Sequence, residues 1–171
     1  MTYTKLLWAG LLWLLACGQA LAQPQPGIID LDPAVPKVSL DGRSVVWVDP
    51  DGAATIAQVA ADMGTDWSLR MPGTQYNIDG RALWIRFDVR ARNYGHWFLE
   101  LASSGLDRVQ LFHQGAHGEW VTLEAGDSRA VSDWPLPGRF PTFELEGSPD
   151  SVMRYWLRIE HTRVKIGRAH V

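Results

Sequence analysis

The fold is decided by the stretch ALWIRFDVRARNYGHWFLELA, which runs from Ala82 to Ala102. Apolar and polar side chains alternate along its first half. The two faces that result are Leu83, Ile85, Phe87 and Val89 on one side, and Trp84, Arg86, Asp88 and Arg90 on the other. Alternation with period two is typical of a strand with one buried face. We therefore expect the aliphatic face to lie in the core and the face with Trp84 to point outward.

The second half of this stretch also alternates, with Trp97, Leu99 and Leu101 on one face. Between the halves, Asn93-Tyr94-Gly95 supplies residue types that tolerate the positive φ of a tight turn. The pattern predicts an antiparallel hairpin over residues 82–102, at the centre of the fold.

The rest of the chain reads as short strands separated by turns. The expected strands cover residues 43–48, 66–69, 106–113, 119–123, 143–145 and 153–160. One short amphipathic helix follows Thr55, a candidate N-cap, and ends at Gly64. Many short strands with turns every ten residues or so predict an all-β fold, a β-sandwich of jelly-roll type with one short helix.

The N-terminus predicts export. Lys5 precedes an uncharged apolar run, and Ala20-Leu21-Ala22 is a suitable cleavage site, so residues 1–22 are expected to be a signal peptide. The alternative is a lipoprotein signal that uses Cys17, the only cysteine. In both cases the product leaves the cytoplasm, for the periplasm or the extracellular space.

The remaining boundaries follow from composition. Residues 23–42 are rich in proline and are expected to form a linker or a loosely packed arm. Residues 43–165 form the predicted β-sandwich domain. Residues 166–171 have no strand or capping pattern and resemble the translation of a sequencing adapter, so we expect a non-native tail, with a short natural tail as the alternative.

Composition argues against several classes of function. The net charge is −3 and no basic cluster is present, so a nucleic-acid partner is not expected. The sequence has no phosphate-binding glycine loop, no Gly-x-Ser-x-Gly motif and no cysteine in its body. We therefore predict no cofactor, no metal site and no catalytic residues. Scattered carboxylates and histidines leave a secreted hydrolase as a weakly supported hypothesis.

One set of residues is a candidate ligand site. Trp84 and Arg86 share the expected outward face of one strand, and Trp156 and Arg158 share the same face of another. Aromatic rings stack on sugar faces and arginine binds carboxylates or hydroxyls, so adjacent strands would present a ligand platform. The alternative is that both tryptophans pack beneath a covering loop, for which residues 126–141 are the candidate.

Several segments recur in the order known from one family. They are residues 83–87 (LWIRF), 97–101 (WFLEL), 106–112 (LDRVQLF), 126–127 (GD), 139–143 (RFPTF) and 155–159 (YWLRI). Together, over residues 45–164, the chain resembles the 7TMR-DISMED2 domain, the extracellular sensor domain of bacterial receptors with seven transmembrane helices. The resemblance implies a jelly-roll sandwich similar to carbohydrate-binding modules. It also implies helices downstream in the inner membrane and a cytoplasmic output module, such as a diguanylate cyclase or histidine kinase.

The resulting hypothesis is a periplasmic ligand-binding sensor domain, with carbohydrate as the candidate ligand, truncated from a transmembrane receptor. Its partners would be a small-molecule or carbohydrate ligand and, through the missing helices, the membrane. A ligand would act by shifting the population of two arrangements of the domain. The alternative is a free secreted carbohydrate-binding module or accessory protein. Neither hypothesis makes this chain an enzyme.

Overall fold

The computed structural model describes residues 24–147, 149 and 151–162. Within these residues the chain is mostly β-structure. The elements are β1 (Ile28–Leu31), β2 (Val45–Asp49), α2 (Ile56–Ala60), β3 (Ser68–Leu69), β4 (Ala82–Ala91), β5 (Trp97–Glu100), β6 (Arg108–Gln114), β7 (Trp120–Ala125), the 3-10 helix η1 (Val131–Asp133), β8 (Thr142–Leu145) and β9 (Met153–Glu160). The all-β class with one short α-helix is confirmed, whereas the jelly-roll arrangement stays a prediction. No helix in the described part is long and apolar enough to cross a membrane.

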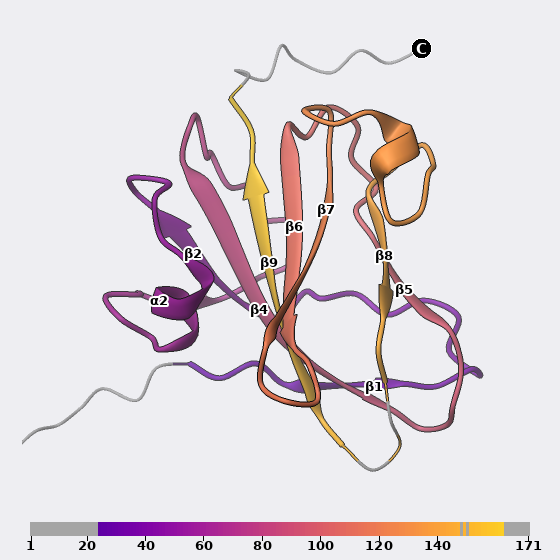
Figure 1. Ribbon diagram of the computed structural model, residues 1–171. Helices are drawn as coiled ribbons and strands as arrows, with labels where there is room; N and C mark the ends of the chain where they lie inside the picture. Colours follow the sequence, from indigo (N-terminus) through magenta and orange to yellow (C-terminus); the bar gives the residue numbers. More distant parts are fainter. Residues whose placement is uncertain (1–23, 148, 150, 163–171) are drawn as a thin grey trace, which may run out of the picture.

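Strand β4 is the centre of a seven-stranded sheet with the order β3-β2-β4-β9-β6-β7. Strand β9 pairs with β4 along residues 82–89. On the other edge of β4, β2 pairs antiparallel with residues 82–86 and β1 pairs parallel with residues 88–91. Figure 1 shows β4, β9 and β6 side by side in the middle of the molecule. Both edges of β4 are therefore occupied by other strands.

The predicted hairpin over residues 82–102 is wrong, although both of its strands exist. Strand β5 does not pair with β4 but with β8, in a separate two-stranded sheet. Because β1, β2 and β9 fill both edges of β4, no edge is left for β5. Neither Asn93 nor Gly95 is among the residues with positive φ, so the connection is not the tight turn that the sequence suggested.

The main core lies between the two sheets. It contains the aliphatic face of β4 as predicted, together with inward side chains of the other strands. Its fully or nearly fully buried members include Leu83, Ile85, Phe87, Val89, Val109, Leu111, Phe143, Leu145, Tyr155 and Leu157. The loop over residues 126–141 closes this core through Trp134, which is 6% exposed. That loop therefore covers the aliphatic face of β4, not the face with Trp84.

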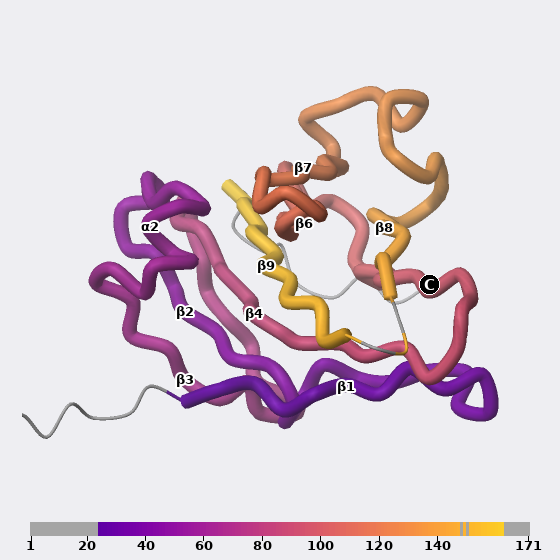
Figure 2. The backbone as a smooth tube through the Cα atoms, turned by 60° about the horizontal axis from the view of Figure 1, so that its bottom comes forward, coloured from indigo at the N-terminus to yellow at the C-terminus, as the bar shows by residue number. Residues whose placement is uncertain are grey.

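The other face of β4 was expected to point outward, and for three of its four residues this is wrong. Trp84, Arg86 and Asp88 are 0%, 1% and 7% exposed, and only Arg90 is exposed. A second core covers this face, made by Val45, Val59, Trp67, Ala82, Trp84, Phe112 and Trp156. Helix α2 and the segment after it supply the cover, and Figure 2 shows α2 and β8 at opposite sides of the domain.

Helix α2 begins where the sequence predicted. The Thr55 hydroxyl accepts the Gln58 N–H at 3.4 Å, and the Gln58 side chain accepts the Thr55 N–H at 2.9 Å, which is a capping box. Its end comes earlier than expected, at Ala60, and Asp62 then takes a φ of 53°. This left-handed residue directs the following segment back over the sheet.

The predicted proline-rich arm over residues 23–42 contains β1. Its side chains Ile29 and Leu31 are buried in the main core. The predicted signal peptide, residues 1–22, and the predicted tail, residues 166–171, lie outside the described residues.

Candidate functional site

The strand register brings the four predicted site residues together. Trp84 lies opposite Arg158, and Arg86 lies opposite Trp156, on one face of the neighbouring strands β4 and β9. Residues opposite each other in antiparallel strands have their side chains on the same side of the sheet. The geometry thus forms one cluster of two tryptophans and two arginines, which we call the Trp-Arg cluster.

Half of the Trp-Arg cluster is sealed. The Trp84 ring is fully buried and stacks on Phe112, with ring centroids 5.6 Å apart. Arg86 donates from Nη1 to Asp62 Oδ1 at 2.7 Å, and its guanidinium lies 4.6 Å from the centre of the Trp67 ring. Asp62 Oδ1 also accepts the Trp67 indole N–H at 2.8 Å. Arg86 therefore fastens the covering segment to the sheet.

Burial governs the electrostatics of Arg86. Desolvation by burial lowers the pKa of the Arg86 guanidinium, and the charge of Asp62 opposes that shift. The Arg86 side chain is 1% exposed, whereas the Asp62 side chain is 39% exposed. Removing the carboxylate would therefore leave a charged guanidinium in an apolar layer without its counterion.

We call the rest of this face, over β9, β6 and β7, the open half; there the Arg158 side chain is 11% exposed. Arg158 donates to the carbonyl oxygen of Gly52 at 2.6 Å and to Gln110 Oε1 at 3.1 Å, and it forms an ion pair with Glu160. Its guanidinium lies 5.7 Å from the centre of the Trp84 ring. These contacts fix Arg158 at the boundary between the sealed half and the open half of the face.

Strands β6 and β7 extend the open half with polar groups. Glu124 Oε2 accepts from Arg108 Nη2 and from Gln110 Nε2, both at 2.9 Å. Arg129 adds a longer ion pair to Glu124 Oε1 at 3.4 Å. Burial raises the pKa of Glu124, but the hydrogen bond and charge of Arg108, with Gln110 and Arg129, lower it below its usual value overall. We call Gln110, Glu124 and Arg158 the polar row.

An aromatic side chain flanks the polar row. Trp120 on β7 is half-buried and meets Trp156 edge to face, with centroids 5.3 Å apart and planes at 78°. Trp156 itself is only 6% exposed. Trp120, Gln110 and Glu124 were not predicted from the sequence as site residues. The outward alternation of β6, which places Gln110 beside Arg158, was the signal that could have found the polar row.

A comparison with protein families now identifies the chain. The sequence model of 7TMR-DISMED2, described as 7TMR-DISM extracellular 2, matches residues 41–166, which is more than half of the 171 residues. The chain belongs to the 7TMR-DISMED2 family. The resemblance drawn from its segments is confirmed, and the chain is an extracellular sensor domain of the 7TM-DISM receptors. A search of curated proteins finds no match to this sequence.

The 7TMR-DISMED2 family is a sensor family and not a catalytic one. Among the described residues, no group of three or more His, Cys, Asp or Glu side chains could hold a metal ion. His113, one of the scattered histidines, is 3% exposed and lies with its ring 5.4 Å from that of Tyr155. The face that carries the Trp-Arg cluster and the polar row presents aromatic rings and paired charges.

Proposed function

We propose that this 7TMR-DISMED2 domain is the periplasmic, ligand-binding part of a receptor in the bacterial inner membrane, and that it binds a carbohydrate. The observation that carries the proposal is the polar row of Gln110, Glu124 and Arg158 beside the half-buried ring of Trp120. Sugars are recognised by an aromatic face combined with a few directed donors and acceptors. The jelly-roll arrangement implied by the family resemblance agrees with this ligand class.

The residues of the Trp-Arg cluster take different roles in this proposal. Arg158 contacts the ligand, and Trp156 supports the Trp120 ring from below. Trp84 and Arg86 are sealed, so they act by holding Arg158 and the covering segment in place. A ligand that displaces the Arg158 contact with Gly52 O would loosen the link between β9 and the segment before α2.

The contact between Arg158 and Gly52 O could couple ligand binding to a change in the domain. Arg158 lies two residues before the end of β9, where it pairs with Glu160. A ligand that favours one arrangement of these contacts shifts the population of the domain, and the shift would be transmitted along β9 toward the transmembrane part. The size of the shift is limited by the difference in ligand affinity between the two arrangements.

A free secreted carbohydrate-binding module is the second candidate, because the same polar row would serve it. The coding sequence downstream of Lys165 separates the two. A run of apolar helices supports the receptor, whereas a stop codon without such helices contradicts it.

The binding proposal is tested on a glycan array followed by calorimetric titration of the best glycan. Trp120→Ala and Arg158→Gln are each expected to weaken binding at least about tenfold, since stacking and charged hydrogen bonds each contribute on the order of 1–3 kcal/mol. Phe98→Ala, which removes an aromatic ring that is 54% exposed on β5, is the matched control and should bind normally. Retention of full affinity by Trp120→Ala, or binding of no glycan at all, would contradict the proposal.

A further inference from the structure

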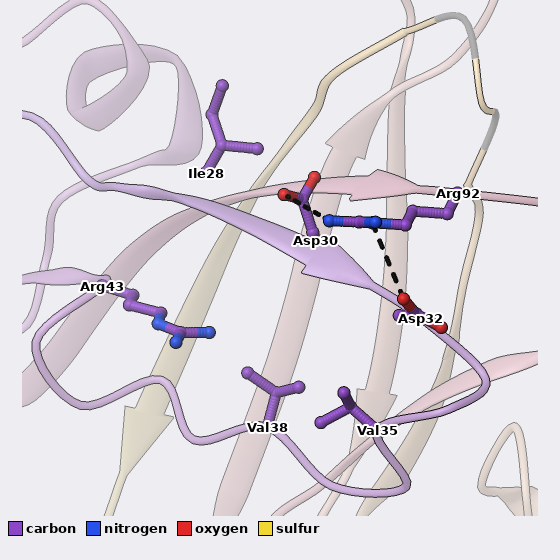
Figure 3. Close-up of a pocket in the computed structure, with 7 residues that line it drawn as sticks. All are labelled: Ile28, Asp30, Asp32, Val35, Val38, Arg43 and Arg92. Carbon is purple, nitrogen blue, oxygen red and sulfur yellow. Dashed lines mark ion pairs between the residues drawn. The ribbon is translucent and has the colours of Figure 1, made fainter.

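A second concave site lies at the far end of β4 from Trp84. A cavity of about 390 Å³ opens between β1 and the loop over residues 33–43. Its lining combines two carboxylates, two guanidinium groups and three aliphatic side chains: Asp30, Asp32, Arg43, Arg92, Ile28, Val35 and Val38. Figure 3 shows Val35, Val38 and Arg43 across the cavity from β1.

The alternation of β1 builds one wall of this cavity. Ile29 and Leu31 point into the main core, so Ile28, Asp30 and Asp32 lie on the opposite side. Among the described residues, β1 pairs with β4 alone, and its parallel register sets Asp30 beside Arg90. The Arg90 Nε–H donates to Asp30 Oδ1 at 2.9 Å, which fixes the position of this carboxylate.

The two guanidinium groups of the cavity are only loosely paired, whereas Asp30 pairs closely with Arg90 and Asp32 Oδ1 accepts the Ala34 N–H at 2.9 Å. Arg92 lies 3.8 Å from Asp30 Oδ2 and 3.8 Å from Asp32 Oδ2, beyond hydrogen-bond distance of either, and is 64% exposed (Figure 3). The Arg43 side chain makes no ion pair or hydrogen bond within the described part of the chain. Both guanidinium groups can therefore accept a new anionic partner without breaking a close contact.

The apolar wall is unusually accessible. Ile28 is 47% exposed and Val35 is 46% exposed, and both face the same cavity. Val38 is half-buried, packs against the main core and completes this wall. Covering these aliphatic groups removes apolar surface from water, which favours binding of a ligand with an apolar side chain.

We propose that this cavity binds a small zwitterion with an aliphatic side chain, of the class of the aliphatic α-amino acids. The ligand carboxylate pairs with Arg43 and Arg92, the ammonium group pairs with Asp32 and Asp30, and the side chain covers the aliphatic wall. A simple anion would face two carboxylates, and a simple cation would face two arginines. A zwitterionic ligand places its carboxylate beside the arginines and its ammonium group beside the carboxylates. The volume suits such a small ligand.

This inference does not rest on the carbohydrate proposal, because the two sites share no residue. The test is calorimetric titration of the whole chain with L-leucine. Binding is expected in the micromolar to millimolar range, with at least about tenfold weaker binding for N-acetyl-L-leucine, which lacks the ammonium charge, and for L-leucinamide, which lacks the carboxylate. L-serine, which lacks the aliphatic group, should also bind more weakly.

Variants locate the binding. Arg43→Gln, at an exposed side chain that lines the cavity, is expected to weaken L-leucine binding at least about tenfold while the melting temperature is unchanged. Val35→Ser should weaken it less. Arg139→Gln, at an exposed arginine outside the cavity, is the matched control, and Trp120→Ala should bind L-leucine normally.

Three results would overturn the inference. These are no L-leucine binding at millimolar concentration, equal affinity for N-acetyl-L-leucine, or unchanged affinity in the Arg43→Gln variant. Tighter binding of an N-acetylated, amidated leucine peptide than of L-leucine would also overturn it. That result would instead indicate peptide addition along the outer edge of β1.

Discussion

The two halves of the outer face of the large sheet use the same residue types to different ends. Over β2 and β4, helix α2 and the segment after it cover Trp84 and Arg86, which are 0% and 1% exposed. Over β9, β6 and β7 the burial is less complete, because the Arg158 side chain is 11% exposed and Trp120 is half-buried. The two halves therefore hold the same residue types in different environments: Trp84 and Arg86 in the sealed half, Trp120 and Arg158 in the open half.

The difference shows that the covering segment, not the strand pattern, decides what an outward residue does. Beneath the cover, an arginine needs a dedicated counterion, which Asp62 supplies at 2.7 Å. On the open side, an arginine can share its donors among a backbone carbonyl, an amide and a carboxylate, as Arg158 does. Buried contacts that stabilise the fold are therefore concentrated in the sealed half, whereas the polar side chains of the open half are less deeply buried.

The largest loss of stability is expected when a buried side chain of the sealed half is removed. Trp84→Ala removes a fully buried ring that stacks on Phe112 and should lower the free energy of unfolding by about 3–5 kcal/mol. Trp120→Ala, on the open half, should cost only about 1 kcal/mol, because its ring is only partly buried and meets Trp156 edge to face. Urea denaturation of both variants measures the difference, and equal losses would erase the distinction between the two halves.

A smaller loss of stability is expected when the charge of Asp62 is removed, because Asp62 holds the covering segment to Arg86 on the sheet. Asp62→Asn keeps an acceptor for Trp67 and tolerates the φ of 53°, but it leaves Arg86 without its counterion. The expected loss is about 2 kcal/mol, below the range for a fully buried pair because the Asp62 carboxylate is partly exposed. Asp66→Asn, at an exposed carboxylate nearby, should change stability by less than about 0.5 kcal/mol. The comparison fails if the two variants unfold at the same urea concentration.

The smallest expected effect is a change of stability with pH, which arises from Glu124 in the open half. The pKa of Glu124 is lower in the folded chain than its usual value of 4.5, so the folded state favours the ionised form. Its contribution is present above that usual value and is lost as the pH falls through the folded pKa. Glu124→Gln should therefore cost about 1 kcal/mol at pH 7 and progressively less below pH 4.5. A difference that stays constant down to pH 3 would contradict this assignment.

Much of the secondary structure could be predicted from the sequence, because each strand carries its own alternation. Strand β9 has the predicted bounds, and Thr55 caps α2 as predicted. The pairing of β4 could not be predicted locally. Its partners β9 and β1 are distant in sequence, and their competition for its edges leaves β5 to pair with β8. A short strand within a proline-rich segment, as β1 is, gives little periodic signal.

The candidate site was predictable in its membership but not in its exposure. The alternation of β4 and β9 placed Trp84, Arg86, Trp156 and Arg158 on one face, and the register brings them together. Which of them meets solvent depends on the path of the chain after α2. That path depends on the left-handed conformation of Asp62, for which a single aspartate gives no reliable signal.

Strand β9 pairs with β4 along residues 82–89 on one edge and with β6 along residues 108–112 on the other. A force along β9 therefore acts in shear on the hydrogen bonds of two strand pairs at once. These bonds resist the force together and do not open one at a time. The strand behaves mechanically as a rod embedded in the sheet. Displacement at one of its ends would therefore carry β4 and β6 with it.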